Sequence, residues 1–283
     1  MTTIRTFGFK PMHAEIEVKP LAFVRELPNL LGRPHRAAFC QLLWLTRGTM
    51  TMRIDFRDIC LREGDAMLIS CGQMCQYDIT SAYDGFAVLF TRDFFTETEV
   101  DATFLHSSET LNPTSMNVPV KASAELINSS IALLRSELAS APDTYGRSIS
   151  RSLLRMMLYE MERKRTSAKT EAMMPDPVTR RFFHLVEMHY KTERAAAFYS
   201  QKLGVCEKAL TNGLRESIGL GVKEYIDSRT MLEAKRMLAY TLMSAKEIGY
   251  ELGFDEPTNF NKFFRRHCGT TPLEFREKSS PAR

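Results

Sequence analysis

The feature that most constrains this fold is a helical corner that occurs twice near the C-terminus, about fifty residues apart. The first copy, "FYSQKLGVCEKALTNGLRESIGLG", spans residues 198–221, and the second, "AKEIGYELGFDEPTNFNKFFRRHCG", spans residues 245–269. Leu203-Gly204-Val205 in the first copy corresponds to Leu252-Gly253-Phe254 in the second. In both copies two apolar residues four apart follow the corner, and a further glycine then ends the pattern. One such match is common in helical hairpins, but two copies indicate a repeated unit.

The spacing of small residues in each copy has a steric reason. A helix pair joined by a short turn needs a backbone with positive φ at the corner, which glycine adopts without strain. Such helices also cross closely, so the first helix needs a small residue at the crossing point. Ser200 and Gly249 lie four residues before the corner glycines and meet that need. The pattern predicts two helix-turn-helix units, in which the second helix enters the DNA major groove.

The segments around the second copy extend the pattern. Residues 222–240 predict a connecting helix, and Ser244 is placed to cap the helix that opens the second copy. At the end, "GTTPLEFR" places Thr271 as a cap and Pro272 in the first turn of a last helix. With Gly269 and the aromatic-Arg pair Phe275-Arg276, residues ~178 to 278 resemble the DNA-binding domain of AraC/XylS-type transcription regulators.

The resemblance covers about a third of the chain and implies an all-α double helix-turn-helix domain over residues 178–283. It also implies a bacterial, sequence-specific transcription regulator, with double-stranded DNA as its partner and RNA polymerase as a further candidate partner. A surplus of positive charge in this region suits a polyanion, since residues 178–283 hold 18 Lys plus Arg against 13 Asp plus Glu.

The resemblance assigns contacts to the outward faces of the two recognition helices, which it starts near Cys206 and Asp255. Asn pairs bidentately with adenine, and Lys or Arg pairs with guanine. The candidates for base contact are Lys208, Thr211, Asn212, Thr258, Asn259 and Lys262. The candidates for phosphate contact are Arg215, Asn261, Arg265 and Arg266. Leu210, Leu214, Phe260, Phe263 and Phe264 are predicted to face the core.

Two departures weaken the first recognition helix. Cys206 stands where many relatives have a capping serine, and Gly213 lies inside the helix, where it costs ~1 kcal/mol relative to Ala. We therefore expect the second unit to carry more of the sequence specificity. Alanine at Lys262 should then reduce specific binding more than alanine at Lys208.

Residues 37–91 change to a pattern of short strands separated by turn signals. The predicted strands are "FCQLLWLT", "TMTMRIDF", "DICL", "AMLIS", "CQYDI" and "FAVLFT", and Gly64 supplies a positive φ in the turn "REGD". From Thr49 to Phe56, residues Met50, Met52, Ile54 and Phe56 alternate onto one face. Strands of this length and spacing predict a small barrel or sandwich.

This strand region resembles the cupin-type barrel that such regulators often carry. In the run "LREGDAMLISCGQMCQYDI", Cys71 and Cys75 replace the proline and histidine of the cupin pattern, so a metal-dependent enzyme lacks its ligands. We expect no metal, no cofactor and no enzymatic activity. A barrel without metal still has room for a small-molecule effector, and Trp44, Phe56, Tyr77 and Phe86 are the candidate pocket residues, with ordinary core packing as the alternative.

Residues 121–165 switch to apolar spacings of three and four and predict two antiparallel helices broken at "APDTYG". Leu126, Leu133, Leu153 and Met157 are candidates for a homodimer seam, and the alternative is that these helices cover the barrel. The chain is thus predicted to have a cupin-like sensing and dimerisation domain (residues 1–165), a linker (166–177) and the DNA-binding domain (178–283). A regulator whose N-terminal domain binds no ligand, and only dimerises or binds a protein, remains open, and a cupin enzyme with a DNA-binding tail is a third alternative.

Composition limits the other classes. With 44% hydrophobic and 25% charged residues the chain is typical of a globular protein, and no apolar run approaches the ~18 residues of a membrane span. The N-terminus lacks the apolar centre of a signal peptide, so we expect a cytoplasmic protein. The six cysteines form no Cys-x-x-Cys pair, which favours reduced, buried thiols.

Overall fold

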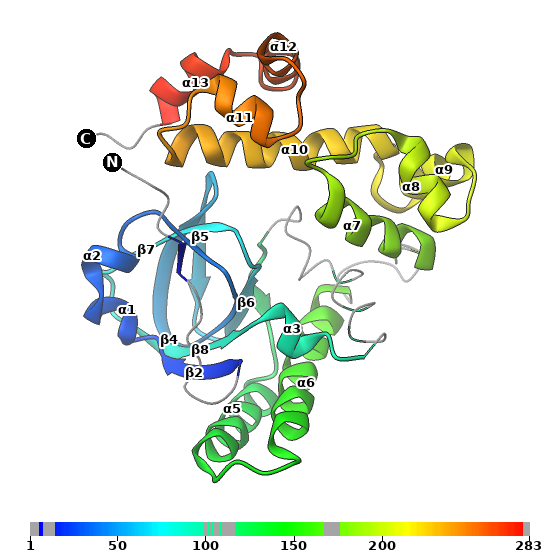
Figure 1. The fold of residues 1–283 in the computed structure, drawn as a ribbon. Helices are drawn as coiled ribbons and strands as arrows, with labels where there is room; N and C mark the ends of the chain where they lie inside the picture. Colours follow the sequence, from blue (N-terminus) through cyan, green and yellow to red (C-terminus); the bar gives the residue numbers. More distant parts are fainter. Residues whose placement is uncertain are drawn as a thin grey trace. The chain divides into compact units, whose positions relative to one another are not determined.

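The computed structural model describes residues 6–7, 15–98, 101, 104, 108, 117–166 and 176–279. The chain divides into two compact units, one of Arg5–Met173 and the other including Met174–Arg283 (Figure 1). The N-terminal unit is built on a sheet and the C-terminal unit is helical, as the sequence predicted. Most of the predicted linker, residues 166–177, lies outside the described residues.

Nine strands and three short helices whose bounds fall within the described residues precede the helical pair of the N-terminal unit. The strands are β1 (Thr6–Phe7), β2 (Ile16–Pro20), β3 (His35–Ala37), β4 (Cys40–Ile54), β5 (Arg57–Arg62), β6 (Asp65–Ile69), β7 (Met74–Tyr77), β8 (Tyr83–Phe90) and β9 (Val120–Lys121). The short helices are α1 (Phe23–Glu26), α2 (Pro28–Leu31) and α3 (Arg92–Phe95). Gly64, with φ of 76°, turns the chain between β5 and β6 as predicted.

The central strand β4 corrects the predicted strand boundaries. We expected two strands separated at Gly48, but β4 runs unbroken through this glycine. The register against β8 shifts between Leu45 and Arg47, which marks a bulge, and Gly48 has a φ of 81°. The bulge lets one strand serve two regions of the sheet, because its first half pairs with β6 and β8 and its second half with β5 and β7.

Two apolar cores lie on opposite faces of β4, since successive side chains of a strand point to opposite sides. Leu42 and Trp44 belong to a core shared with the helical pair, whereas Leu43 and Leu45 belong to a core between the strands. The predicted closed cupin-like barrel is not confirmed. The pairing path of the described strands, β1-β3-β7-β4-β6-β9, has two ends, so these strands form an open sheet.

The helical pair consists of α5 (Ala124–Ala139) and α6 (Gly146–Thr166), which pack against each other as predicted. Ser123 caps α5 by accepting a hydrogen bond from the Leu126 amide. Leu134, Leu154, Met157 and Leu158 are fully or nearly fully buried in the core shared with the sheet. The alternative interpretation, in which these helices cover the sheet, is therefore correct for this face of the pair.

The C-terminal unit contains seven helices within residues 176–279. They are α7 (Pro177–His189), α8 (Ala196–Leu203), α9 (Glu207–Ile218), α10 (Val222–Tyr240), α11 (Ala245–Glu251), α12 (Pro257–Cys268) and α13 (Pro272–Ser279). One continuous apolar core joins all of them, because its members come from α7 through α12 and Phe275 of α13 packs against it. No helix among the described residues of either unit is long and apolar enough to cross a membrane.

Candidate nucleic-acid interface

The first helix-turn-helix unit is formed by α8 and α9. Gly204 ends α8 in the left-handed conformation, with φ of 69°, as the corner pattern requires. Ser200 is buried at the crossing, and Leu210 and Leu214 anchor the inner face of α9. Cys206 precedes α9 without a side-chain capping hydrogen bond, as expected for a residue in the place of a serine.

The second unit, α11 and α12, is more firmly built. Ser244 accepts a hydrogen bond from the Glu247 amide, and the Glu247 carboxylate accepts one from the Ser244 amide, which forms a capping box. At the helix crossing, a Cβ added to Gly249 would lie 3.1 Å from the Cβ of Phe260, so only glycine fits there without a shift. Phe260 and Phe264 are completely buried, and Phe263 is nearly so, as predicted.

The predicted base-reading residues lie on the outward faces of the two recognition helices. On α9, Lys208 and Asn212 are exposed and Thr211 is half-buried. On α12, Thr258, Asn259 and Lys262 are all exposed. Each recognition helix therefore has one face packed into the core and one polar face that carries the predicted readers.

The four predicted phosphate-contacting residues have different surroundings. Arg215, Asn261 and Arg265 are exposed, Arg215 at the end of α9 and the other two on α12. Arg266 is also exposed, but its guanidinium lies 3.4 Å from the Asp227 carboxylate of α10. His267 Nε2 lies at the same distance from that carboxylate, so the C-terminal end of α12 is tied to α10.

The connecting helix α10 holds a buried charge network. Arg229 Nε donates to Glu187 of α7 over 2.7 Å, and its guanidinium lies 3.5 Å from Glu233. The Arg229 guanidinium also stacks over the Tyr190 ring at 4.0 Å. Burial alone would lower the pKa of Arg229, but Glu187, Tyr190 and Glu233 together outweigh burial and raise it. A permanently charged Arg229 therefore fastens α10 to α7.

Comparison with known proteins now decides the type of these units. A family model described as "Helix-turn-helix domain" matches residues 199–278. Over 93 residues the chain is 27% identical to the arabinose operon regulatory protein of Salmonella typhimurium, which covers 33% of this chain and 32% of that one. Residues 199–278 form an AraC-type helix-turn-helix domain.

Three further similarities have lower sequence identity. An uncharacterized HTH-type transcriptional regulator of Staphylococcus aureus strain MSSA476 is 23% identical over 112 residues, which are 40% of this chain and 15% of the relative. A ToxT structure from Vibrio cholerae covers 94% of this chain and 98% of its own at 12% identity, with a TM-score of 0.42. The C-terminal domain of AraT from Geobacillus stearothermophilus covers 38% and 90% at 19% identity, with a TM-score of 0.37.

The four candidate pocket residues of the N-terminal unit are not brought together. Trp44 is buried in the core shared with α5 and α6, where its Nε1 donates to Asn128 Oδ1 over 2.8 Å, and Phe86 packs against that core. Tyr77 is buried in the other core, where its hydroxyl donates to Gln41. Phe56 lies at an exposed turn beyond β4, because Asp55 has a φ of 53° and ends the alternation that was predicted to bury Phe56.

The four candidate dimer residues differ in how exposed their side chains are. Met157 is completely buried against the sheet and is unavailable to a partner, whereas Leu133 on α5 is 57% exposed. Leu126 and Leu153 are half-buried. Ile149, Met156 and Tyr159 of α6 are exposed large hydrophobic residues that the sequence analysis did not single out.

Sequence reasoning also missed three residues that act between helices. Asp227 of α10 and the loop residues Lys191 and Arg194 each contact a residue 39 to 60 positions away. No local pattern could have pointed to them, since helix periodicity reports only which face is buried. Within the described residues, no group of three His, Cys, Asp or Glu side chains is arranged to hold a metal ion.

Proposed function

We propose that this chain is a sequence-specific DNA-binding transcription regulator that reads DNA with α9 and α12. The observation that carries the proposal is the duplication of the helix-turn-helix. Each copy buries the apolar face of its recognition helix in the core and exposes a polar face. Both copies lie in the C-terminal part of the chain, which has a net positive charge. The chain spans only 15% of its staphylococcal relatives and 32% of the arabinose operon regulatory protein, so the function rests on the site itself.

We assign the base contacts to Lys208, Thr211 and Asn212 in the first subsite and to Thr258, Asn259 and Lys262 in the second. Arg215, Asn261 and Arg265 would hold phosphates beside these contacts, which sets the register of the protein on the duplex. Arg266 would reach a phosphate only in exchange for its interaction with Asp227. The two recognition helices would enter successive major grooves on one face of the DNA, about one turn or ~34 Å apart.

The test is a selection of double-stranded DNA from a random-sequence library by the full chain, followed by mobility-shift titrations of the enriched sequence at two salt concentrations. Each good bidentate pair is worth about 1–3 kcal/mol, so Lys262→Ala should weaken specific binding about 5- to 150-fold. Lys208→Ala should weaken it less, because α9 lacks a capping side chain and contains Gly213.

A matched control is Arg57→Ala, which removes an exposed cation from β5 in the N-terminal unit and should leave binding unchanged. Binding that is steeply salt-dependent, indifferent to sequence and equal for all three variants would refute specific readout. Equal losses for Lys208→Ala and Lys262→Ala would instead refute the stronger role of the second unit.

We further propose that the N-terminal unit dimerises through the outer face of α5 and α6. This face carries Leu133, Ile149, Met156 and Tyr159, each at least 40% exposed. Exposed apolar residues gathered on one helical pair mark an interaction surface more often than isolated ones do. A homodimer would place two copies of the double helix-turn-helix unit on one operator.

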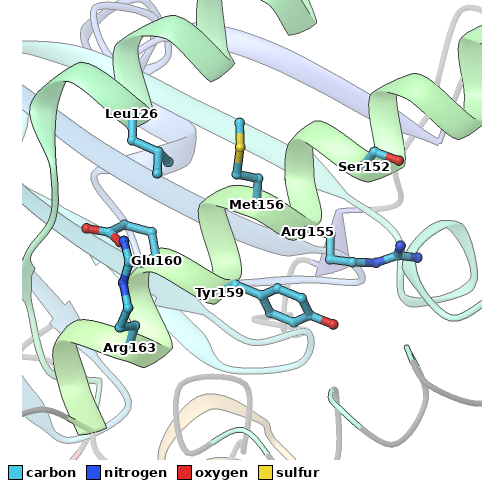
Figure 2. A pocket seen from close by; sticks show the side chains of 7 residues that line it. All are labelled: Leu126, Ser152, Arg155, Met156, Tyr159, Glu160 and Arg163. Carbon is cyan, nitrogen blue, oxygen red and sulfur yellow. The ribbon is translucent and has the colours of Figure 1, made fainter.

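A small-molecule effector would act on this same face. A hollow of about 330 Å³ is lined by Leu126 of α5 and by Ser152, Arg155, Met156, Tyr159, Glu160 and Arg163 of α6 (Figure 2). Its lining is mainly apolar, and Arg155 and Arg163 would bind a small amphipathic anion in exchange for their ion pairs with Asp101 and Glu160. Because Met156 and Tyr159 belong to both the hollow and the proposed dimer face, an occupant would shift the population of dimers.

Thermal-shift screening separates this gated regulator from one whose N-terminal unit only dimerises or binds a protein. A small anion that binds the native state at 100 times its Kd stabilises it by about 2.7 kcal/mol. Loss of that stabilisation in Arg155→Ala would support the hollow as its site. Stabilisation that persists in Arg155→Ala would move the site elsewhere, and a screen of metabolite anions without any stabilisation would favour the ligand-independent regulator.

A further inference from the structure

The loop between α7 and α8 contacts the corner of the second helix-turn-helix unit. The Arg194 guanidinium lies over the Phe254 ring at 3.4 Å from its centroid and donates a hydrogen bond to the Leu252 carbonyl. Lys191 Nζ forms an ion pair with Glu251 Oε1 over 2.6 Å. These contacts join residues about 60 positions apart, one group before the first unit and the other within the second.

The two corner glycines also differ in how closely other parts of the chain approach them. A Cβ added to Gly204 would meet nothing within 4 Å, so the first corner is open. A Cβ added to Gly253 would lie 1.9 Å from the Lys191 carbonyl oxygen, so the second corner is pressed against the loop backbone. The second corner therefore packs against the α7–α8 loop, while the helices before and after it, α11 and α12, pack on α10.

The loop contacts are a second connection between the two helix-turn-helix units, beside α10, and they restrict how the units can move relative to each other. The helix α10 has 19 residues, about 28 Å at 1.5 Å per residue, and packs on both units through α9, α11 and α12. If α10 were the sole connection, the second unit would retain freedom to pivot at the Thr241–Met243 turn that joins α10 to α11. The contacts of Arg194 with Phe254 and Leu252 limit this freedom at the corner itself, in addition to the Asp227 interactions that tie the C-terminal end of α12 to α10.

We infer that Arg194 is a positioning residue that fixes the separation and angle of the two recognition helices, so that the protein binds its two DNA subsites at one spacing. This inference rests on the proposed DNA-binding function. An arginine suits the task because its planar guanidinium stacks on an aromatic ring while its N–H groups donate to a carbonyl. A lysine keeps the charge and the apolar stem but loses the planar stack.

The experiment uses the sequence that the full chain enriches from the random double-stranded library. One base pair is inserted or deleted between the two subsites, which turns the second subsite by about 34–36° around the DNA axis. Affinities of the parent, +1 and −1 duplexes are measured by mobility shift for the wild type, Arg194→Ala, Arg194→Lys and Lys202→Ala. Lys202→Ala is the matched control, because Lys202 lies over Phe198 at 5.8 Å within a single unit.

The wild type and Lys202→Ala should lose about 30-fold or more in affinity on each altered duplex, since the contacts of one helix are lost. Arg194→Ala should lose less than about 5-fold, and Arg194→Lys should fall between them. We call the affinity for the parent duplex divided by the affinity for an altered duplex the spacing ratio. A purely structural role for Arg194 would lower the affinity for all three duplexes alike and leave the spacing ratio unchanged.

Three outcomes are distinct. A spacing ratio in Arg194→Ala and Arg194→Lys equal to that of the wild type, with circular dichroism unchanged, overturns the inference while the DNA-binding function stands. If Arg194→Ala does not fold, the Arg194→Lys ratio decides. A library that yields no enriched sequence refutes the proposed function, and the inference with it.

Discussion

Substituting alanine at the two corner glycines tests how the second unit is held. Both glycines have φ near 70°, at 69° for Gly204 and 72° for Gly253, and a side chain in the left-handed region costs about 1–2 kcal/mol. At Gly253 the new methyl group would also lie 1.9 Å from the Lys191 carbonyl oxygen, a backbone atom that yields only if the loop moves. Overpacking of this kind typically costs a further 1–3 kcal/mol. We expect Gly204→Ala to cost about 1–2 kcal/mol and Gly253→Ala about 2–5 kcal/mol.

The assay follows the two units separately in the full chain. Trp44 is the single tryptophan and lies in the N-terminal unit, so fluorescence excited at the tryptophan band reports the unfolding of that unit. Far-UV circular dichroism is dominated by helices and therefore reports mainly the helical C-terminal unit. For a domain of about 100 residues each kcal/mol lowers Tm by about 4–8 °C. Gly253→Ala should lower the dichroism Tm by about 10 °C or more and leave the tryptophan transition in place.

Equal losses for the two variants would refute this reasoning. That result would mean that the α7–α8 loop moves away from the second corner at little cost, and the contact would then hold nothing in place. A downward shift of the tryptophan transition in Gly253→Ala would also contradict it, because Gly253 belongs to the C-terminal unit.

Three further substitutions have defined expectations. Gly213→Ala should raise the dichroism Tm and stabilise the C-terminal unit by about 1 kcal/mol, because the methyl group would meet Asp176 and Thr179 at 3.6 and 3.8 Å without a clash; a lower Tm would contradict this. Leu133→Arg should dissociate a homodimer in analytical ultracentrifugation with little change in Tm, and Leu273→Arg, at a similarly exposed leucine of α13, should leave the dimer intact. An intact Leu133→Arg dimer would place the interface elsewhere. Asp176→Ala removes the cap of α7 and should cost about 1 kcal/mol at pH 7. Burial alone would raise the pKa of Asp176, but the hydrogen bonds from Thr179 and the backbone amides of the first helical turn together outweigh burial and lower the pKa. The carboxylate's contribution to stability is therefore present above about pH 4 and is lost below it. Wild type and Asp176→Ala should therefore converge in stability as the pH falls below about 4, and a constant difference down to pH 2 would argue against the charged cap.

Much of the C-terminal unit could be predicted from the sequence because its determinants are local. Helix faces follow from apolar residues three and four apart, which is why Leu210, Leu214, Phe260 and Phe264 were placed in the core correctly. Corner glycines and caps such as Ser244 act on backbone groups within a few residues of themselves. One copy of the corner pattern is common in helical hairpins, but its duplication indicated a DNA-binding domain.

The N-terminal unit was predicted less well because a strand's partners lie far away in the chain. The alternation from Met50 to Phe56 held only as far as Ile54, where Asp55 turns the backbone. Periodicity also cannot say which of two buried faces a residue joins, so Trp44 and Tyr77 were assigned to one pocket and lie in two cores. In α6, Met157 and Met156 look equivalent by composition, yet the sheet covers Met157 and leaves Met156 exposed.

The two helix-turn-helix units, their inner faces and the chemistry of their outer faces follow from local sequence patterns, since each depends on contacts within one helical hairpin. How the two helix-turn-helix units are held to each other depends instead on contacts that form only in the folded domain. Arg194 and Asp227 carry no local signature, and their roles arise from partners that folding brings beside them, Phe254 in one case and Arg266 in the other. A side chain's partner across such a distance is fixed by the packing of the whole unit.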